Sequence, residues 1–203
     1  MAEIKNSDLV EVKNPEPEKY KDIKPESDIS KSDAKNYWNE KFKQEDIKTD
    51  DNGVEYREGD TLKPNTTYEV NGYKYKTDDQ GRIISAEGKL RMRDPEYTRD
   101  MEDVRNKEGQ EYRDTDDRGH LIGHQFGGSD KLENLVPMDQ KCNQKDYVKI
   151  ENYLADAVKD GADVKLKIEP VYSEDSKRPS EFRISYSVDG DRDVVVLKNG
   201  GDD

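Results

Sequence analysis

The chain contains only two histidines, and they are its main candidates for acid–base catalysis. His120 and His124 both lie in the segment Asp-Arg-Gly-His-Leu-Ile-Gly-His, residues 117–124. A histidine side chain has an ordinary pKa of about 6.5, so it is partly neutral near pH 7 and can accept a proton as a general base. The alternative is that Asp-Arg-Gly forms a turn with a local ion pair and that His120 is a partly buried polar residue.

Polar residues follow His120 at spacings that resemble a known family. Asn134 lies 14 residues after His120, and Asn143 lies nine residues after Asn134. Glu151 follows eight residues later. Together with Asp-Arg-Gly-His, this set resembles the DNA/RNA nonspecific endonucleases of the ββα-metal (His-Me finger) superfamily. The resemblance follows the order of elements over about residues 62–197, and its specific part is residues 117–151.

The chemistry of such an enzyme explains these residue types. Phosphodiester hydrolysis needs an activated water, neutralised charge on phosphorus and a stabilised leaving alkoxide. We expect His120 to take the proton of the water. Magnesium prefers oxygen ligands and keeps several waters, so the carboxamide oxygen of Asn143 together with phosphate oxygens would suffice to hold it. The expected cofactor is therefore Mg²⁺, for which Mn²⁺ can substitute.

Glu151 is the second residue that we assign to the metal site and to catalysis. It lies two helical turns beyond Asn143, near the same helix face, and helical side chains lean toward the N-terminus. Its place beside Ile150 and Leu154, at the edge of an apolar stripe, favours partial burial. The alternative is a solvated glutamate on the polar side of the helix.

Other catalytic assignments come from the resemblance alone. Asn134 matches an asparagine that supports the site by hydrogen bonds, although an ordinary turn residue is the alternative. Asp117 and Arg118 match the first half of the motif. We assign Asp117 to holding the loop, and Arg118 to phosphate contact or structural ion pairing.

The resemblance also implies an upstream arginine that stabilises charge on the phosphate. Residues 91–118 contain six of the eleven arginines but also ten acidic residues, so local ion pairing is an alternative for each arginine. We select Arg91 and Arg93, which follow the expected meander. Lys145, near Asn143, is a further candidate for contact with substrate phosphates.

A His-x-x-x-His pattern such as that of His120 and His124 can also bind zinc from one face of a helix. The sequence shows no third ligand, and Gly123 disfavours a helix there. The resemblance instead places His120 near a strand end, with the metal held by Asn143. We therefore expect His124 to lie beside the site or on the surface.

Alternating and helical patterns predict an α+β fold, an antiparallel sheet with a ββα-metal core. Asn71-Gly72 between alternating runs is a strong hairpin signal. An apolar stripe predicts a helix over residues 143–159, and Gly161 is a natural stop. Residues 88–117 lack periodicity and predict a long irregular excursion. The predicted strand regions are 67–70, 73–75 and 82–86 in a meander, a short run at 132–138, and 164–168, 182–188 and 194–197 in the C-terminal third.

The N-terminal part has a different composition. Residues 1–60 contain 17 acidic and 11 basic residues and few aliphatic ones. We expect residues 1–60 to be an acidic linker or tail, partly disordered, with a short helix over 33–44. Residues 61–203 are then the nuclease domain. We expect no signal peptide, transmembrane segment or membrane partner, and the single cysteine excludes an intramolecular disulfide.

The formal net charge of −13 argues against a nucleic-acid partner, because an acidic protein repels polyanions. It suits an acidic DNA mimic or inhibitor, which is the alternative function, but such a protein has no use for the spaced polar set. A catalytically inactive nuclease fold used as a scaffold is a third hypothesis. The intact His120 and Asn143 count against it.

The chain also resembles the C-terminal nuclease modules of bacterial polymorphic toxins. That resemblance implies a secreted protein, delivered into target cells, that cleaves DNA, with RNA as a further candidate substrate. It also implies a cognate immunity protein, while the resemblance to the endonuclease family implies products that carry 5′-phosphates.

Overall fold

The Asn71-Gly72 turn closes the first long hairpin of the fold. Both residues have positive φ angles, 54° and 71°, which a two-residue turn between right-twisted strands requires. Tyr68 pairs with Tyr75 across this hairpin, and both rings face the core. The predicted three-stranded meander is confirmed. Its strands are β4 (Thr67–Val70), β5 (Tyr73–Thr77) and β6 (Ile83–Lys89).

A second antiparallel meander forms the C-terminal third, as predicted. Asp189 and Gly190, with φ angles of 50° and 95°, make the turn between its last two strands. Along these strands the apolar residues alternate with polar ones, so that one face of the sheet is buried. The strands are β9 (Val164–Tyr172), β10 (Pro179–Val188) and β11 (Asp191–Lys198).

The two meanders join edge to edge into one six-stranded antiparallel sheet with the order β11-β10-β9-β6-β5-β4. The join is the pairing of β6 with β9, in which Ala86 lies opposite Ile168. The chain between these two strands leaves the sheet and returns to it. This long connection, which begins with the predicted irregular segment and continues to β9, carries both histidines, so the sheet supports it from its two ends.

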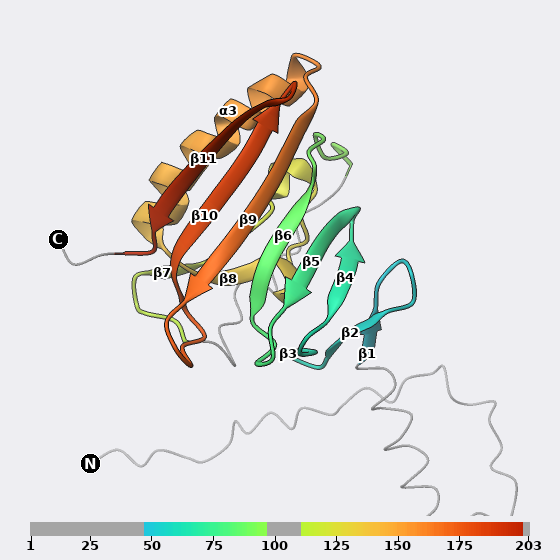
Figure 1. Ribbon diagram of the computed structural model, residues 1–203, viewed down its shortest axis with the longest axis vertical. Helices are drawn as coiled ribbons and strands as arrows, with labels where there is room; N and C mark the ends of the chain where they lie inside the picture. Colours follow the sequence, from blue (N-terminus) through green and yellow to red (C-terminus); the bar gives the residue numbers. More distant parts are fainter. Residues whose placement is uncertain (1–46, 97–110, 201–203) are drawn as a thin grey trace, which may run out of the picture. The chain divides into compact units, whose positions relative to one another are not determined.

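The connection between β6 and β9 contains the ββα unit that the resemblance implied. Two strands pair as an antiparallel ribbon, and a helix follows and ends before Gly161, whose φ is 90°. In Figure 1, a computed structural model, helix and ribbon lie behind the sheet, on the side that its apolar residues face. The α+β fold with a ββα-metal core is confirmed. The elements are β7 (Asp116–His120), η2 (His124–Phe126), η3 (Leu132–Asn134), β8 (Leu135–Asp139), π-helical η4 (Cys142–Tyr147) and α3 (Val148–Lys159).

Two details differ from the pattern-based prediction. Pro137 lies inside β8 instead of ending it, because β8 pairs with β7 alone among the described strands and a proline is tolerated at an unpaired edge. The expected helix begins as a π-helix, up to Tyr147, which pattern analysis does not distinguish from an α-helix.

The structure describes residues 47–96 and 111–200. The helix expected over residues 33–44 lies outside them, as do Arg99 and Arg105. No helix in the described ranges is long and apolar enough to span a membrane.

Residues 47–60 lie in the predicted N-terminal linker or tail, and the structure describes strands in them, while the domain boundary at residue 60 stays a prediction. Tyr56 is 7% exposed, and its ring stacks on that of Tyr68 with 4.6 Å between centroids. The buried side chains of Tyr56 and Leu62 join this segment to the core. This segment forms a small sheet of β1 (Ile47–Thr49), β2 (Glu55–Glu58) and β3 (Thr61–Leu62).

Candidate active site

The loop that follows His120 is attached to the scaffold by tyrosine hydroxyl groups. Tyr68 of β4 donates to the carbonyl oxygen of Glu133 (3.1 Å), and Tyr73 of β5 donates to that of Phe126 (2.6 Å). Tyr147 of the π-helix donates to the carbonyl oxygen of Leu121. All three rings are buried. The sheet and the helix thus set the path of the loop, because each buried carbonyl requires its donor.

Asn134 closes the loop from inside. Its Oδ1 accepts from the backbone N–H of Ile122 (2.8 Å), and its Nδ2 donates to the carbonyl oxygens of Ile122 (2.9 Å) and Ser129 (2.8 Å). Asn134 is fully buried. These contacts are of the kind that we expected from a supporting residue, while its importance for catalysis stays a prediction.

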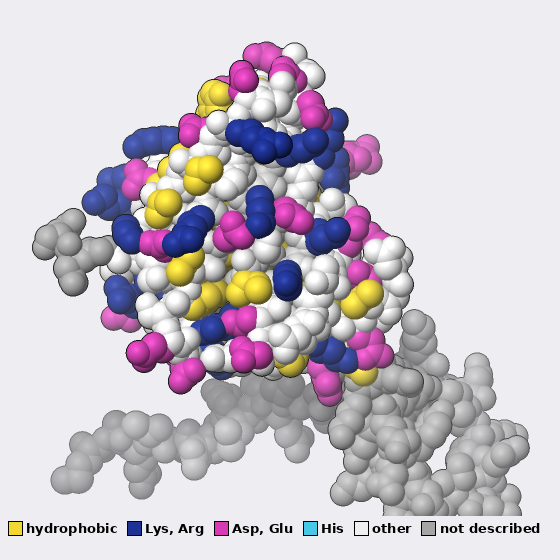
Figure 2. All heavy atoms as spheres, viewed as in Figure 1, with side chains coloured by type: hydrophobic (Ala, Val, Ile, Leu, Met, Phe, Trp, Pro, Cys, Tyr) yellow, Lys and Arg dark blue, Asp and Glu magenta, His cyan; other side chains and the backbone are white. Residues whose placement is uncertain are grey.

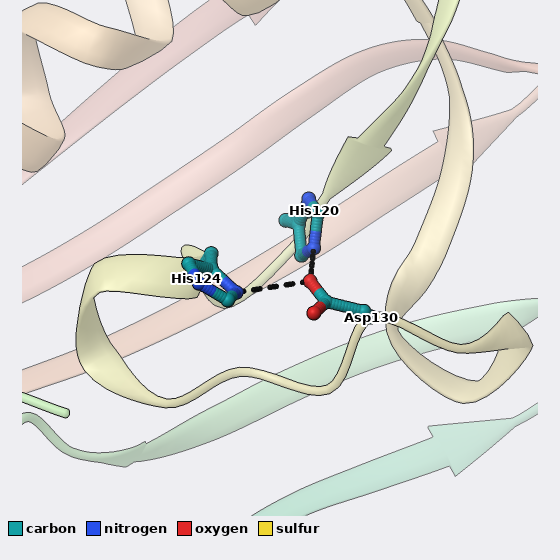
Figure 3. A group of neighbouring side chains, drawn as sticks. All are labelled: His120, His124 and Asp130. Atoms are coloured by element: carbon teal, nitrogen blue, oxygen red, sulfur yellow. Dashed lines mark hydrogen bonds and ion pairs between the residues drawn. The ribbon is translucent and has the colours of Figure 1, made fainter. Parts of the chain in front are cut away.

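His120 lies at the C-terminal end of β7, and its imidazole points at a carboxylate (Figure 3). Nε2 of His120 lies 2.7 Å from Oδ1 of Asp130, and Nδ1 of His124 lies 3.0 Å from the same oxygen. Asp130 is 1% exposed. A buried carboxylate is stable only with donors, and the two imidazole N–H groups provide them. Within the described residues, no hydrogen bond involves Nδ1 of His120.

Asn143 lies in the π-helix, and its amide orientation is set by β7. Nδ2 of Asn143 donates to Oδ2 of Asp117 (2.9 Å), as does Nε2 of Gln144 (2.9 Å). Gln140 makes a longer contact with the other oxygen of Asp117 (3.4 Å). Because the nitrogen of Asn143 is engaged, its Oδ1 is the atom available to a cation. The role expected for Asp117, to hold the local structure, agrees with these contacts.

The π-helix also affects how Glu151 lies relative to Asn143. Eight residues of ideal α-helix would rotate a side chain about 80° beyond two full turns. A π-helical turn closes over five residues instead of four, so each residue rotates less. The π-helical start of the helix therefore reduces this offset and brings the two side chains closer to one face.

Glu151 is partly buried, as its place at the edge of the stripe predicted. Burial raises the pKa of its carboxyl group to about 7, and a hydrogen bond with Gln125 only partly opposes this shift. Gly123 lies directly against the carboxylate, and a Cβ there would overlap Oε1 of Glu151. The carboxyl group is thus enclosed by the His120 loop rather than exposed on the helix surface.

Arg118 is 8% exposed and lies opposite Pro137 in the β7–β8 ribbon. Its side chain hydrogen-bonds Tyr112, whose pKa burial raises to about 12. Of the two roles we proposed, phosphate contact and structural pairing, the structure displays a structural contact.

The candidate phosphate-binding residues lie in three different settings. The guanidinium of Arg91 donates to the carbonyl oxygen of Asn71 and stacks on the ring of Tyr73, 5.0 Å from its centroid. The backbone N–H of Arg93 donates to the carbonyl oxygen of Gln125 (2.9 Å), which places Arg93 beside the His120 loop. Lys145 is exposed in the π-helix, two residues after Asn143. Of the two upstream arginines that we selected, Arg93 is therefore the one whose backbone contacts the His120 loop.

Asp130 is the residue that sequence reasoning missed. It supplies a third potential ligand beside His120 and His124, which the sequence did not make apparent. The only signal was an acidic residue ten positions after His120, at the end of a Gly-Gly-Ser turn. We expected His124 to lie either beside the site or on the surface, and it lies beside the site, in contact with Asp130.

The described residues therefore offer two different donor sets. Asn143 and Glu151 each carry a side-chain oxygen, and their meeting around one cation stays a prediction. His120, His124 and Asp130 provide two imidazole nitrogens and a carboxylate oxygen within 4.8 Å of one another. The first set matches a hard cation such as Mg²⁺, and the second a borderline-soft ion.

Comparison with known proteins identifies the family of this chain. The family model for DNA/RNA non-specific endonucleases matches residues 64–190. The type VII secretion system protein EssD of Staphylococcus aureus (strain USA300) is 32% identical over 146 residues, which cover 68% of this chain and 24% of that protein. The chain thus spans about a quarter of the length of this relative.

Similarity to solved structures supports the fold. The crystal structure of NucA from Streptococcus agalactiae, with a magnesium ion bound, superposes with a TM-score of 0.52. The aligned region covers 87% of this chain and 93% of NucA, at 17% sequence identity. At this identity the likeness concerns the fold.

Proposed function

Because the chain belongs to the family of DNA/RNA non-specific endonucleases, we propose that it is a metal-dependent endonuclease that hydrolyses phosphodiester bonds in DNA, with RNA as a second substrate. The observation that carries the proposal is the contact between Nε2 of His120 and the buried carboxylate of Asp130. A carboxylate that accepts from one ring nitrogen selects the tautomer and leaves the lone pair on the other, Nδ1. His120 is thereby prepared to take a proton from water.

The proposed metal site uses oxygen atoms of Asn143 and Glu151. The hydrogen bond from Asn143 to Asp117 directs the amide so that Oδ1 can face a cation, and oxygen donors suit Mg²⁺, with Mn²⁺ as a substitute. When bound, the cation supplies positive charge that offsets the charge developing on the phosphate and the departing oxygen. The magnesium ion in the similar NucA structure supports this choice.

The remaining assigned residues hold the loop and strand of the site in place or neutralise the charge of the substrate phosphates. Asn134 keeps the loop in the shape that brings Asp130 to His120. Arg93 and Lys145 contact substrate phosphates, and Arg91 contributes less because its guanidinium is engaged with the β4–β5 turn. Arg118 supports β7 from its buried position and acts on catalysis through that strand.

The test is plasmid digestion with Mg²⁺ by the wild-type protein and by His120→Ala and Asn143→Ala. Asn152→Ala, an exposed asparagine on the same helix, is the matched control. We expect each of the first two variants to lose about 100-fold or more in rate, the lower range for loss of a general base. The control should cleave at the wild-type rate, and chelator should abolish cleavage by all proteins.

Two outcomes would contradict the proposal. Cleavage that persists in chelator would exclude the single-metal mechanism. A folded wild-type protein without any cleavage would favour the alternative, an acidic DNA mimic or inhibitor, to which the net charge of −13 would be suited.

We further propose that this domain is the toxic part of a bacterial polymorphic toxin that is secreted, delivered into target cells and neutralised by an immunity protein. The type VII secretion system relative supports secretion. Induced expression in bacteria should stop growth and fragment the chromosome, whereas His120→Ala should do neither. Normal growth with active wild-type nuclease in the cells would contradict the toxin role.

A further inference from the structure

The imidazole–carboxylate cluster, which we define as His120, His124 and Asp130, differs in chemistry from the oxygen donors assigned to magnesium. Its three ligand atoms come from one loop and converge within 4.8 Å (Figure 3). We propose that this cluster is a second metal site, selective for Zn²⁺ over Mg²⁺, and that zinc bound there inhibits the nuclease. Only the inhibition rests on the proposed function, because the binding can be tested without it.

The donor types favour zinc. Two imidazoles and one carboxylate form an open three-ligand set, in which a water completes the tetrahedron. Magnesium prefers oxygen atoms and near-octahedral geometry, so it does not compete well for two ring nitrogens. The distances from Oδ1 of Asp130 to the two nitrogens are 2.7 Å and 3.0 Å. Tetrahedral zinc with bonds of about 2.0 Å needs ligand atoms about 3.3 Å apart. Each nitrogen must therefore move about half an ångström or less away from Oδ1, and the two nitrogens, which lie within 4.8 Å of each other, must approach to that spacing.

The cluster is held in place before any ion binds. Asn134 fixes the backbone at Ile122 and Ser129, on both sides of the loop, and Tyr73 holds Phe126 between them. The side chains of His120 and His124 are 10% and 17% exposed, which leaves a route for an ion. Prearranged ligands lose little conformational entropy on binding, so they raise affinity.

Zinc at this position would remove the proposed base. A neutral imidazole has one nitrogen with a lone pair and one with a proton. If Nε2 of His120 gives its lone pair to zinc, the proton lies on Nδ1, and no lone pair remains to accept a proton from water. Zinc also replaces the contact with Asp130 that selects the productive tautomer. Inhibition therefore requires no clash with substrate and no displacement of magnesium.

The sequence makes this site unusually simple to test. The whole chain has two histidines and one cysteine, and Cys142 is 3% exposed. Any site with imidazole ligands must therefore include His120 or His124. Zinc held only by surface carboxylates of this acidic protein would be insensitive to substitution of either histidine.

The experiment is calorimetric titration of the metal-free full chain with ZnCl₂ in the absence of DNA. We expect one ion per chain at the cluster, with affinity reduced about tenfold or more in His124→Gln and in Asp130→Asn. Asn143→Ala and Glu151→Gln, which alter the magnesium donors, should bind zinc within about twofold of the wild type. Thermal unfolding of each variant establishes that it is folded.

Two results would overturn the site. Zinc affinity unchanged in His124→Gln would mean an adventitious ion only, and zinc affinity lost in Asn143→Ala would mean that zinc uses the magnesium donors.

The second readout is plasmid cleavage in Mg²⁺ with added zinc, each protein normalised to its own zinc-free rate. His124→Gln should require about tenfold more zinc for half inhibition. If the protein binds zinc as expected but never cleaves DNA, the zinc site is supported and the nuclease proposal is refuted.

Discussion

At the scale of single residues, the contact between Gly123 and Glu151 decides how the helix meets the His120 loop. The absence of a side chain at Gly123 lets the loop backbone lie directly on the carboxylate. That close approach removes water from Glu151 and raises the pKa of its carboxyl group to about 7. A carboxyl group with a raised pKa at a proposed catalytic site is thus a consequence of packing.

This raised pKa predicts a pH-dependent stability difference in the metal-free protein. Because the folded pKa of Glu151 lies above the ordinary value of 4.5, folding favours the protonated form. Its contribution to stability is full below pH 4.5 and is lost as pH rises to about 7. Glutamine cannot ionise, so the unfolding free energy of Glu151→Gln should rise relative to that of the wild type by about 2 kcal/mol between pH 5 and 8. This figure takes about 1.4 kcal/mol for each pKa unit and reduces the sum for partial contact with solvent.

Urea unfolding in chelator measures this difference. Asp156→Asn, an exposed carboxylate on the same helix, is the control and should show no such gain. A constant free-energy difference between wild type and Glu151→Gln over this pH range would show that the carboxyl group is hydrated.

At the scale of elements, one buried ion pair fastens the ββα unit to the sheet. Arg178, just before β10, donates from Nε and Nη2 to the two carboxylate oxygens of Asp116 in β7, both at 2.7 Å. Its Nη1 donates to the carbonyl oxygen of Asn199 after β11 (2.8 Å). Burial alone would raise the pKa of Asp116, but the bonds from Arg178 and from the backbone of Arg113 outweigh it and lower the pKa.

Removal of this arginine should strongly destabilise the fold. Arg178→Ala leaves the carboxylate of Asp116 buried and without its main partner, so we expect a loss of about 3–5 kcal/mol in unfolding free energy at pH 7. Arg183→Ala, which breaks an exposed pair with Glu181, should cost less than about 1 kcal/mol. Denaturant unfolding of both variants makes the comparison, and equal losses would contradict the assigned role of Asp116–Arg178.

The pH dependence of this pair has the opposite sign to that of Glu151. A lowered pKa means that Asp116 contributes stability above its ordinary value of 3.8, and that this contribution is lost as pH falls through the folded pKa. The free-energy difference between wild type and Arg178→Ala should therefore narrow below pH 3.8.

At the scale of the whole molecule, charge is mixed rather than segregated. The sheet face in Figure 2 carries Lys and Arg interspersed with Asp and Glu, and no histidine is seen on it. A hollow of about 690 Å³ on the sheet includes Lys74, Lys89 and Lys165 but none of the proposed site residues. An acidic protein with dispersed cations should contact few phosphates at one time.

DNA binding by this protein should therefore depend weakly on salt. With two or three phosphate contacts, log K should fall against log salt with a slope of about −2 to −3. Arg93→Ala should reduce the slope by about one unit, whereas Lys74→Ala, in the hollow on the sheet, should not change it. Binding to a short duplex in Ca²⁺ over a salt series gives these slopes. A slope of about −6 or steeper would indicate a broad basic surface that the proposal lacks.

Local chemistry made several parts of this protein predictable from sequence. Asn71-Gly72 and Asp189-Gly190 determine their hairpins because few other residues adopt positive φ angles at low cost. The apolar stripe determines the helix after Asn143, and the spacing of polar residues from His120 indicates the family. Each of these signals depends on residues near one another in the chain.

The tertiary structure alone decided which groups meet. Asp130 reaches His120 because a loop closed by Asn134 folds back on itself, and its path depends on buried hydrogen bonds with distant tyrosines. Packing between distant parts of the chain also decides that β6 pairs with β9. It likewise decides that Tyr56, in the segment predicted as a linker or tail, stacks on Tyr68. Pattern and composition do not encode such contacts, because their free energy comes from burial that exists only once the whole core has formed.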